Sequence, residues 1–191
     1  MIIEACGSGL SHSCQTLSAS MKLLAMKFLA AALLLSGSAN AAPPYRTESV
    51  VLLQPQFVFE ERAPSVQLLS DYIKSVQTAA QQALEGEAPY PASGYLVLAV
   101  RPGGRSMVWL DFQPSLPEPV ASKLRAAILA VPAFEARKGV VVFALNSSLW
   151  NSPARQGFPK PPEWIEAMKG HDKPMEIGDL VDKVWPDKAG N

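Results

Sequence analysis

SGYLVLAVRPGGRSMVWLDFQ, residues 93–113, is the most informative part of this sequence. Two apolar runs, 94–101 and 106–113, flank Pro102-Gly103-Gly104, where glycine can adopt the positive φ angle of a tight turn. Runs of this length that are rich in valine, leucine and aromatic residues are typical of β-strands. These residues therefore predict a β-hairpin.

Helical patterns lie on both sides of this hairpin. Residues 64–84 place apolar side chains at alternating steps of three and four, which is typical of an amphipathic helix, and residues 119–131 do the same. Residues 139–146 predict a third strand, and residues 49–60 predict a strand or a strand pair interrupted at Pro55. This order predicts an α+β fold with two layers, in which two helices pack on one face of an antiparallel sheet of three to four strands.

Side-chain alternation along the strands predicts two apolar faces. The face that receives the helices carries Leu96, Leu98, Val100, Val108, Leu110, Phe112, Val141, Phe143 and Leu145. The opposite face carries Tyr95, Val97, Ala99, Arg101, Met107, Trp109, Asp111, Val140, Val142 and Ala144. This second face is too apolar to remain in water, so either the C-terminal tail or a partner protein should cover it.

Residues 1–41 are expected to be a secretory signal peptide, whose typical features lie in residues 21–41. Lys22 and Lys27 precede the apolar run 28–35, and small residues lead to a cleavage site after Ala41. The run is shorter than the roughly 20 residues that span a bilayer, so the mature form is expected to lack a transmembrane anchor. The signal predicts an extracytoplasmic location.

The residues before this signal do not resemble any part of a leader. Residues 1–20, or 1–25, are consistent with a start codon assigned too far upstream, with translation beginning at Met21 or Met26. The alternative is an unusually long polar leader.

The mature chain is expected to have three parts. Residues 42–63 form an N-terminal extended or strand segment, and residues 64–146 form the α+β domain. Residues 147–191 form a proline-rich extension that packs on the domain and contains short helices near 162–168 and 177–185.

Composition and motifs favour a binding protein over an enzyme. Of the 191 residues, 48% are hydrophobic and 18% are charged, which suits a globular chain, and 17 basic residues balance 17 acidic ones. That balance, without a basic stripe, gives no support to a nucleic-acid partner. Both cysteines, Cys6 and Cys14, precede the cleavage site. We therefore expect neither a metal site nor a cofactor.

The candidates for acid–base chemistry are few. His171, beside Asp172, is either a general base or an exposed loop histidine. Asp111 is expected to pair across the strands with Arg101, and its combination with Glu135 is the alternative carboxylate pair.

Two stretches resemble the C-terminal domains of the TonB and TolA family. They are YPASGYLVLAVRPGGRSMVWLDF, residues 90–112, and PVASKLRAAILAVPAFEARKGVVVFAL, residues 119–145. The resemblance covers about residues 72–145, and its landmarks are Gly94, Gly103, Pro132, Phe134 and Gly139. It implies a domain of periplasmic or envelope proteins that binds a peptide by strand addition at a sheet edge.

The resemblance and the apolar second face together define the predicted binding surface. Residues 140–145 are the expected edge strand. The expected contact residues are Val140, Val142, Ala144, Tyr95, Met107 and Trp109. Arg101 and Arg105 bracket the hairpin turn and form a candidate anion site.

The expected function is that of a periplasmic adaptor that binds another periplasmic or envelope protein. The alternatives are an immunity or inhibitor protein that neutralises a toxin, and a cell-envelope hydrolase that uses scattered carboxylates. The hydrolase would need a cleft lined by at least two acidic side chains.

Overall fold

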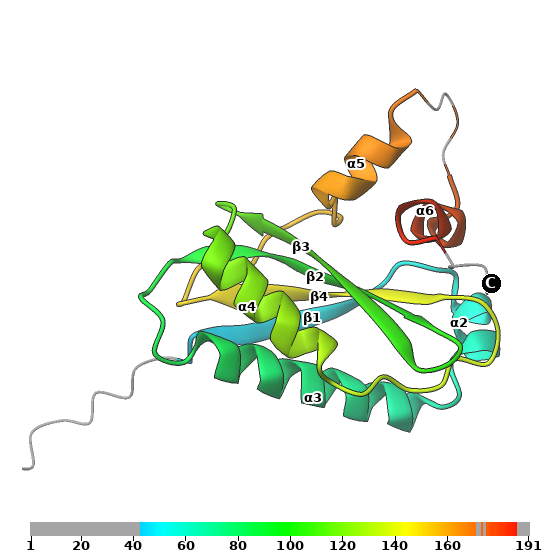
Figure 1. The fold of residues 1–191 in the computed structure, drawn as a ribbon, viewed down its shortest axis with the longest axis horizontal. Helices are drawn as coiled ribbons and strands as arrows, with labels where there is room; N and C mark the ends of the chain where they lie inside the picture. The colour runs from blue at the N-terminus through cyan, green and yellow to red at the C-terminus, as the bar shows by residue number, and fades with distance from the viewer. Residues whose placement is uncertain (1–42, 171–172, 174, 187–191) are drawn as a thin grey trace, which may run out of the picture. The chain divides into compact units, whose positions relative to one another are not determined.

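The computed structural model describes residues 43–170, 173 and 175–186, all of which belong to the unit Ala42–Asn191. The predicted signal peptide and His171 lie outside the described residues. The elements in chain order are β1 (Tyr45–Leu52), α2 (Gln56–Arg62), α3 (Val66–Leu84), β2 (Ala92–Arg101), β3 (Arg105–Gln113), α4 (Glu118–Leu129), β4 (Val141–Leu149), α5 (Pro162–Met168) and α6 (Ile177–Val184). The four strands form one antiparallel sheet in the order β1-β4-β2-β3 (Figure 1). The predicted α+β class and the antiparallel sheet are confirmed.

The predicted hairpin is formed by β2 and β3. Leu96 lies opposite Leu110, and Arg101 lies opposite Arg105 at the closed end. Gly103 and Gly104 have φ angles of 81° and 63°, which only glycine adopts without strain. The turn chemistry therefore fixes the register of the hairpin, as the sequence predicts.

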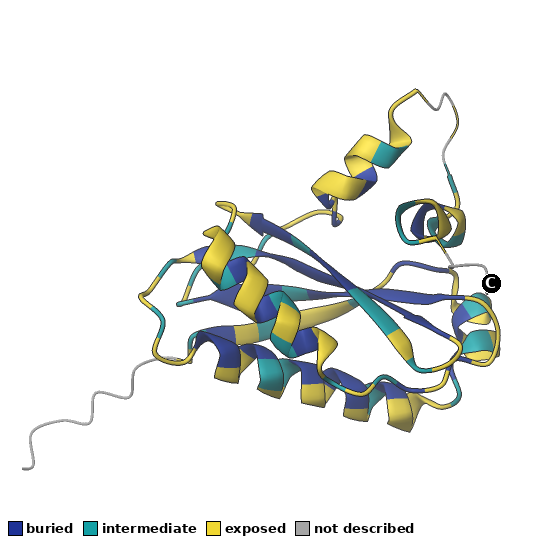
Figure 2. Cartoon of the chain, in the orientation of Figure 1, coloured by how far each residue is buried: buried dark blue, intermediate teal, exposed yellow. Residues whose placement is uncertain are grey.

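The long helices α3 and α4 share a core with one face of the sheet. Ser65 caps α3, because its side chain accepts a hydrogen bond from the Leu68 amide at 3.1 Å. Val76 of α3 and Leu124 of α4 are fully buried in the same cluster as Leu98 and Phe143. Figure 2 shows that each helix buries one side only, while β2 and β4 are buried along most of their length.

The C-terminal segment covers the opposite face of the sheet, so a partial third layer is added to the two that the sequence predicts. Trp164 of α5 and Leu180 of α6 belong to the second core cluster, together with Trp109. The rings of Trp109 and Trp164 meet edge to face, with their centroids 5.5 Å apart. The apolar second face is thus buried by residues of the same chain.

Two ion pairs fasten the C-terminal segment to the sheet. Arg101 of β2 pairs with Asp182 of α6. Near the far end of β3, the Asp111 carboxylate accepts a hydrogen bond from Arg155 at 2.7 Å and another from the Lys160 amide at 2.6 Å. The segment is therefore held by polar contacts at both ends of the hairpin.

The prediction of a strand pair over residues 49–60 is wrong in its second half. Pro55 directly precedes the helix α2, and of the apolar residues in this helix only Phe59 is buried. A short apolar run has no periodicity that separates a strand from a helix. Pro55 favours the helix over the strand, because proline suits the start of a helix and interrupts a strand.

The prediction that residues 140–145 form a sheet edge is also wrong. β4 pairs with β1 on one side and with β2 on the other, so its backbone is hydrogen-bonded on both sides. The reason is that β1 pairs with the side of β4 that we expected to be the free edge. Tyr45 of β1 reaches Ser147 of β4, with 2.9 Å between their side-chain oxygens.

Two buried tyrosines make the fold sensitive to alkaline pH. Burial raises the pKa of the Tyr45 and Tyr72 hydroxyls above the ordinary value near 10. The folded chain favours the neutral form of both tyrosines, so their contribution to stability is complete below about pH 10 and falls as the pH rises further.

We expect Tyr72→Phe, which keeps the edge-to-face contact with Phe134, to lose less unfolding free energy than the parent between about pH 8 and pH 11. Urea unfolding at both pH values measures this, and equal losses in the two proteins would contradict it.

Candidate functional site

The two edges of the sheet, β1 and β3, differ in character. The pairing of β1 with β4 shifts between Thr47 and Ser49, and Arg46 and Glu48 form an ion pair on this strand. A hydrogen bond from Ser148, followed by one from Arg46, lowers the pKa of the Glu48 carboxyl. Irregular register and charges are features that protect sheet edges against pairing with other chains.

The β3 edge is regular along its length, and its two charged residues, Arg105 and Asp111, lie near its ends. Its nine residues pair with β2 in unbroken register, and it contains no proline and no lysine. No strand in the described part of the chain pairs with its outer side. A long regular edge of this kind presents a row of backbone N–H and C=O groups to a partner.

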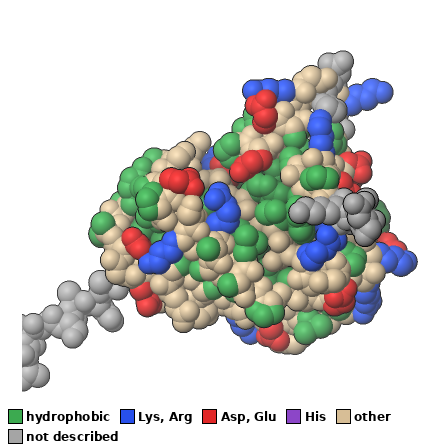
Figure 3. Space-filling view, in the orientation of Figure 1, with side chains coloured by type: hydrophobic (Ala, Val, Ile, Leu, Met, Phe, Trp, Pro, Cys, Tyr) green, Lys and Arg blue, Asp and Glu red, His purple; other side chains and the backbone are tan. Residues whose placement is uncertain are grey.

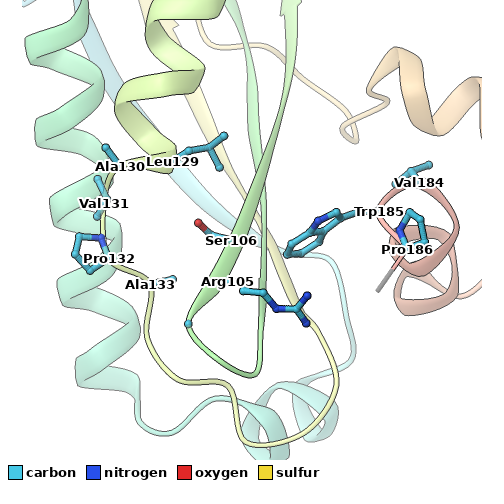
Figure 4. Close-up of a pocket in the computed structure, with 11 residues that line it drawn as sticks. Arg105, Ser106, Leu129, Ala130, Val131, Pro132, Ala133, Val184, Trp185 and Pro186 are labelled. Atoms are coloured by element: carbon cyan, nitrogen blue, oxygen red, sulfur yellow. The ribbon is translucent and has the colours of Figure 1, made fainter. Parts of the chain in front are cut away.

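A hollow of about 680 Å³ lies at the start of β3. Its lining comprises Gly104, Arg105, Ser106, Leu129, Ala130, Val131, Pro132, Ala133, Val184, Trp185 and Pro186. Figure 4 shows Leu129 and the loop after α4 on one side of β3 and Trp185 on the other. We call this space the Trp185 hollow. Among the described residues that line it, Arg105 is the one charged side chain, and its guanidinium carbon lies 5.9 Å from the centre of the Trp185 ring.

A second hollow, of about 340 Å³, lies at the end of β3. Its lining comprises Leu110, Asp111, Phe112, Gln113, Ser115, Leu116, Glu118, Ala121, Arg125, Lys160, Pro162, Glu163 and Ile165. We call it the Lys160 hollow. Unlike the Trp185 hollow, it carries charges of both signs.

The two hollows have the same construction. In each, β3 contributes its exposed edge, α4 or an adjoining loop forms one wall, and the C-terminal segment forms the other wall. We call the β3 edge with these two hollows the β3 groove. On the face shown in Figure 3, basic and acidic side chains are interspersed.

No family model, curated protein or solved structure matches this chain. The resemblance to the TonB and TolA domains thus stays a prediction. The candidate site rests on the geometry of the β3 groove.

The structure corrects most of the predicted binding surface. Five of the six predicted contact residues are buried: Val140, Val142, Ala144, Tyr95 and Trp109. Met107 is half-buried. The second face is not a free surface, because α5 and α6 of the same chain occupy it.

The predicted anion site at Arg101 and Arg105 is also corrected. Arg101 is only 3% exposed, pairs with Asp182 and stacks over Trp185 at 4.4 Å. Arg105 remains at the groove, so the hairpin tip presents one arginine to solvent and not two. The predicted pair between Arg101 and Asp111 is not formed, because Asp111 lies opposite Tyr95.

The two members of the predicted carboxylate pair, Asp111 and Glu135, lie far apart. Glu135 accepts a hydrogen bond from the Gly103 amide at the hairpin turn, whereas Asp111 lies near the other end of β3, about 20 Å away along the strand. Glu118 and Glu163, both exposed, join the buried Asp111 around the Lys160 hollow, so this hollow has the acidic lining that the hydrolase alternative would need. Within the described ranges, no group of three or more His, Cys, Asp or Glu side chains could hold a metal ion.

Sequence reasoning missed the β3 edge although the signal is present. The charged residues of 105–113, Arg105 and Asp111, lie near the two ends of the run, while residues 45–52 carry Arg46 and Glu48 close together. That contrast indicates which of two candidate edges is protected. The walls of the groove could not be found in the same way, because Leu129 and Trp185 are 56 positions apart in the sequence.

None of the helices in the described part of the chain combines the length and apolar character needed to cross a bilayer.

Proposed function

We propose that this chain is a binding module of the periplasm or cell envelope that adds an extended segment of another protein to β3. The observation that carries this proposal is a regular, unpaired β3 edge with a hollow at each end. Backbone hydrogen bonds to β3 supply affinity, and the hollows receive the side chains that point to either face of the added strand. The predicted signal peptide supports an extracytoplasmic location, and the resemblance to the TonB and TolA domains supports the periplasm or envelope.

The hydrogen bonds of the acidic side chains in the Lys160 hollow favour binding over hydrolysis. The buried carboxylate of the Lys160 hollow, Asp111, accepts bonds from Arg155 and from the Lys160 amide and so fixes the groove wall. Its role is to hold the C-terminal segment against β3. Glu118 accepts a hydrogen bond from Ser122 at 2.7 Å, within its own helix.

The proposal is tested by comparing the two sheet edges of the full chain in cells. A photo-crosslinking residue is placed at Gln113, on the β3 edge, or at Val50, on the β1 edge. We expect one dominant protein to be captured from Gln113 and not from Val50, because only β3 offers a regular edge. The identity of the captured protein then separates an adaptor from an immunity protein.

Capture alone does not establish strand addition, so amide hydrogen exchange is the decisive measurement. In the free protein, alternate amides of β3 should exchange quickly because they face outward. The captured partner should slow these amides and leave β1 unchanged. If the partner protects β1, or protects neither edge, strand addition at β3 is wrong.

A further inference from the structure

We propose that the Trp185 hollow selects an apolar residue followed directly by an acidic residue in the added strand. This inference rests on the proposed function and specifies its ligand. It follows from the faces of β3, from the charge at Arg105 and from the direction of the sheet.

The two faces of the Trp185 hollow differ in chemistry. The side chain of Ser106 shares a face with Val108 and Phe112, which belong to the core cluster of α3 and α4, and here Leu129 and Val131 line the hollow. Arg105 shares the face of Trp109, where Trp185 forms the wall. One face is therefore apolar, and the other combines a positive charge with an aromatic ring.

Consecutive residues of an added strand point to opposite faces of the sheet. The residue opposite Ser106 would place its side chain against Leu129 and Val131, where burial of an apolar group is favourable. The residue opposite Arg105 would lie beside the guanidinium group, where a cross-strand pair of opposite charge is favourable.

The direction of the sheet sets the order of the two residues. Every strand pair in this sheet is antiparallel, so an added strand is expected to run from Gln113 toward Arg105. The residue opposite Ser106 then precedes the residue opposite Arg105. The preferred sequence is apolar first and acidic second.

A random nonapeptide library with amidated C-termini tests this specificity on the purified chain. Amidation ensures that any preference for a carboxylate comes from a side chain. We expect selected peptides to slow the outward β3 amides and to contain the apolar–acidic pair. Arg105→Glu should weaken such a peptide roughly tenfold, and an acidic-to-lysine change in the peptide should restore its affinity for this variant.

Arg46→Glu is the matched control, because it reverses an arginine on the opposite edge of the sheet. It should leave the affinity of the selected peptide unchanged. If peptides protect β3 but show no acidic preference, or if Arg105→Glu binds them as well as the parent does, the specificity is wrong while strand addition stands. If no peptide protects β3, both proposals fail.

Discussion

Gly94→Ala is expected to destabilise the protein by about 3 kcal/mol or more. A Cβ atom at this position would lie 2.0 Å from the Asp111 carbonyl oxygen and 2.6 Å from the Phe112 Cα atom. Both are backbone atoms of β3, so no side-chain rotation relieves the overlap. The strands β2 and β3 must move apart, which breaks the ladder that supports the groove. Urea unfolding followed by circular dichroism measures the loss.

Gly178→Ala is the matched control for this variant. Gly178 lies in α6, and a Cβ atom there meets nothing closer than 3.8 Å. Alanine favours a helix by up to about 1 kcal/mol over glycine, so the control should be as stable as the parent or slightly more stable. If Gly94→Ala unfolds at the same urea concentration as the control, the close approach of β3 at Gly94 is wrong.

Val142→Asp is expected to cost about 3–5 kcal/mol at neutral pH, because it places an unpaired charge inside the protein. Val142 has no exposed surface and lies in β4 between two paired strands. Its amide also donates to Gln54 at 2.9 Å, so the backbone cannot turn the new side chain toward water. The substitution tests the position of β4 in the sheet and not the binding site.

The same substitution at Val50 provides the comparison. Val50 is 44% exposed on the β1 edge, so Val50→Asp should change the unfolding free energy by less than about 1 kcal/mol. Burial would raise the pKa of the new carboxyl at position 142. Part of the loss in Val142→Asp should therefore disappear below about pH 4, where the carboxyl is protonated in the folded and the unfolded chain. Equal stability of the two variants at neutral pH would show that β4 lies at an edge.

The local elements of this fold are predictable because each has its signal within a short stretch of sequence. The β2–β3 hairpin follows from two apolar runs around Pro102-Gly103-Gly104, and α3 follows from apolar spacing between Pro64 and Gly86. The alternation of side chains also assigns both sheet faces correctly. A local pattern could not identify α2, whose apolar run is too short to show a period.

Strand order and the position of the groove were decided by the tertiary structure. β1 pairs with β4 across about 100 residues of sequence, as in the contact between Tyr45 and Ser147, and no local pattern specifies that pairing. Because β1 joins β4, the free regular edge falls on β3. Because α5 and α6 cover the second face, that face is closed to a partner, and the β3 edge with its two hollows stays open. The sequence by itself determined which segments form strands and which faces are apolar, whereas long-range packing decided which edge stays open for a partner.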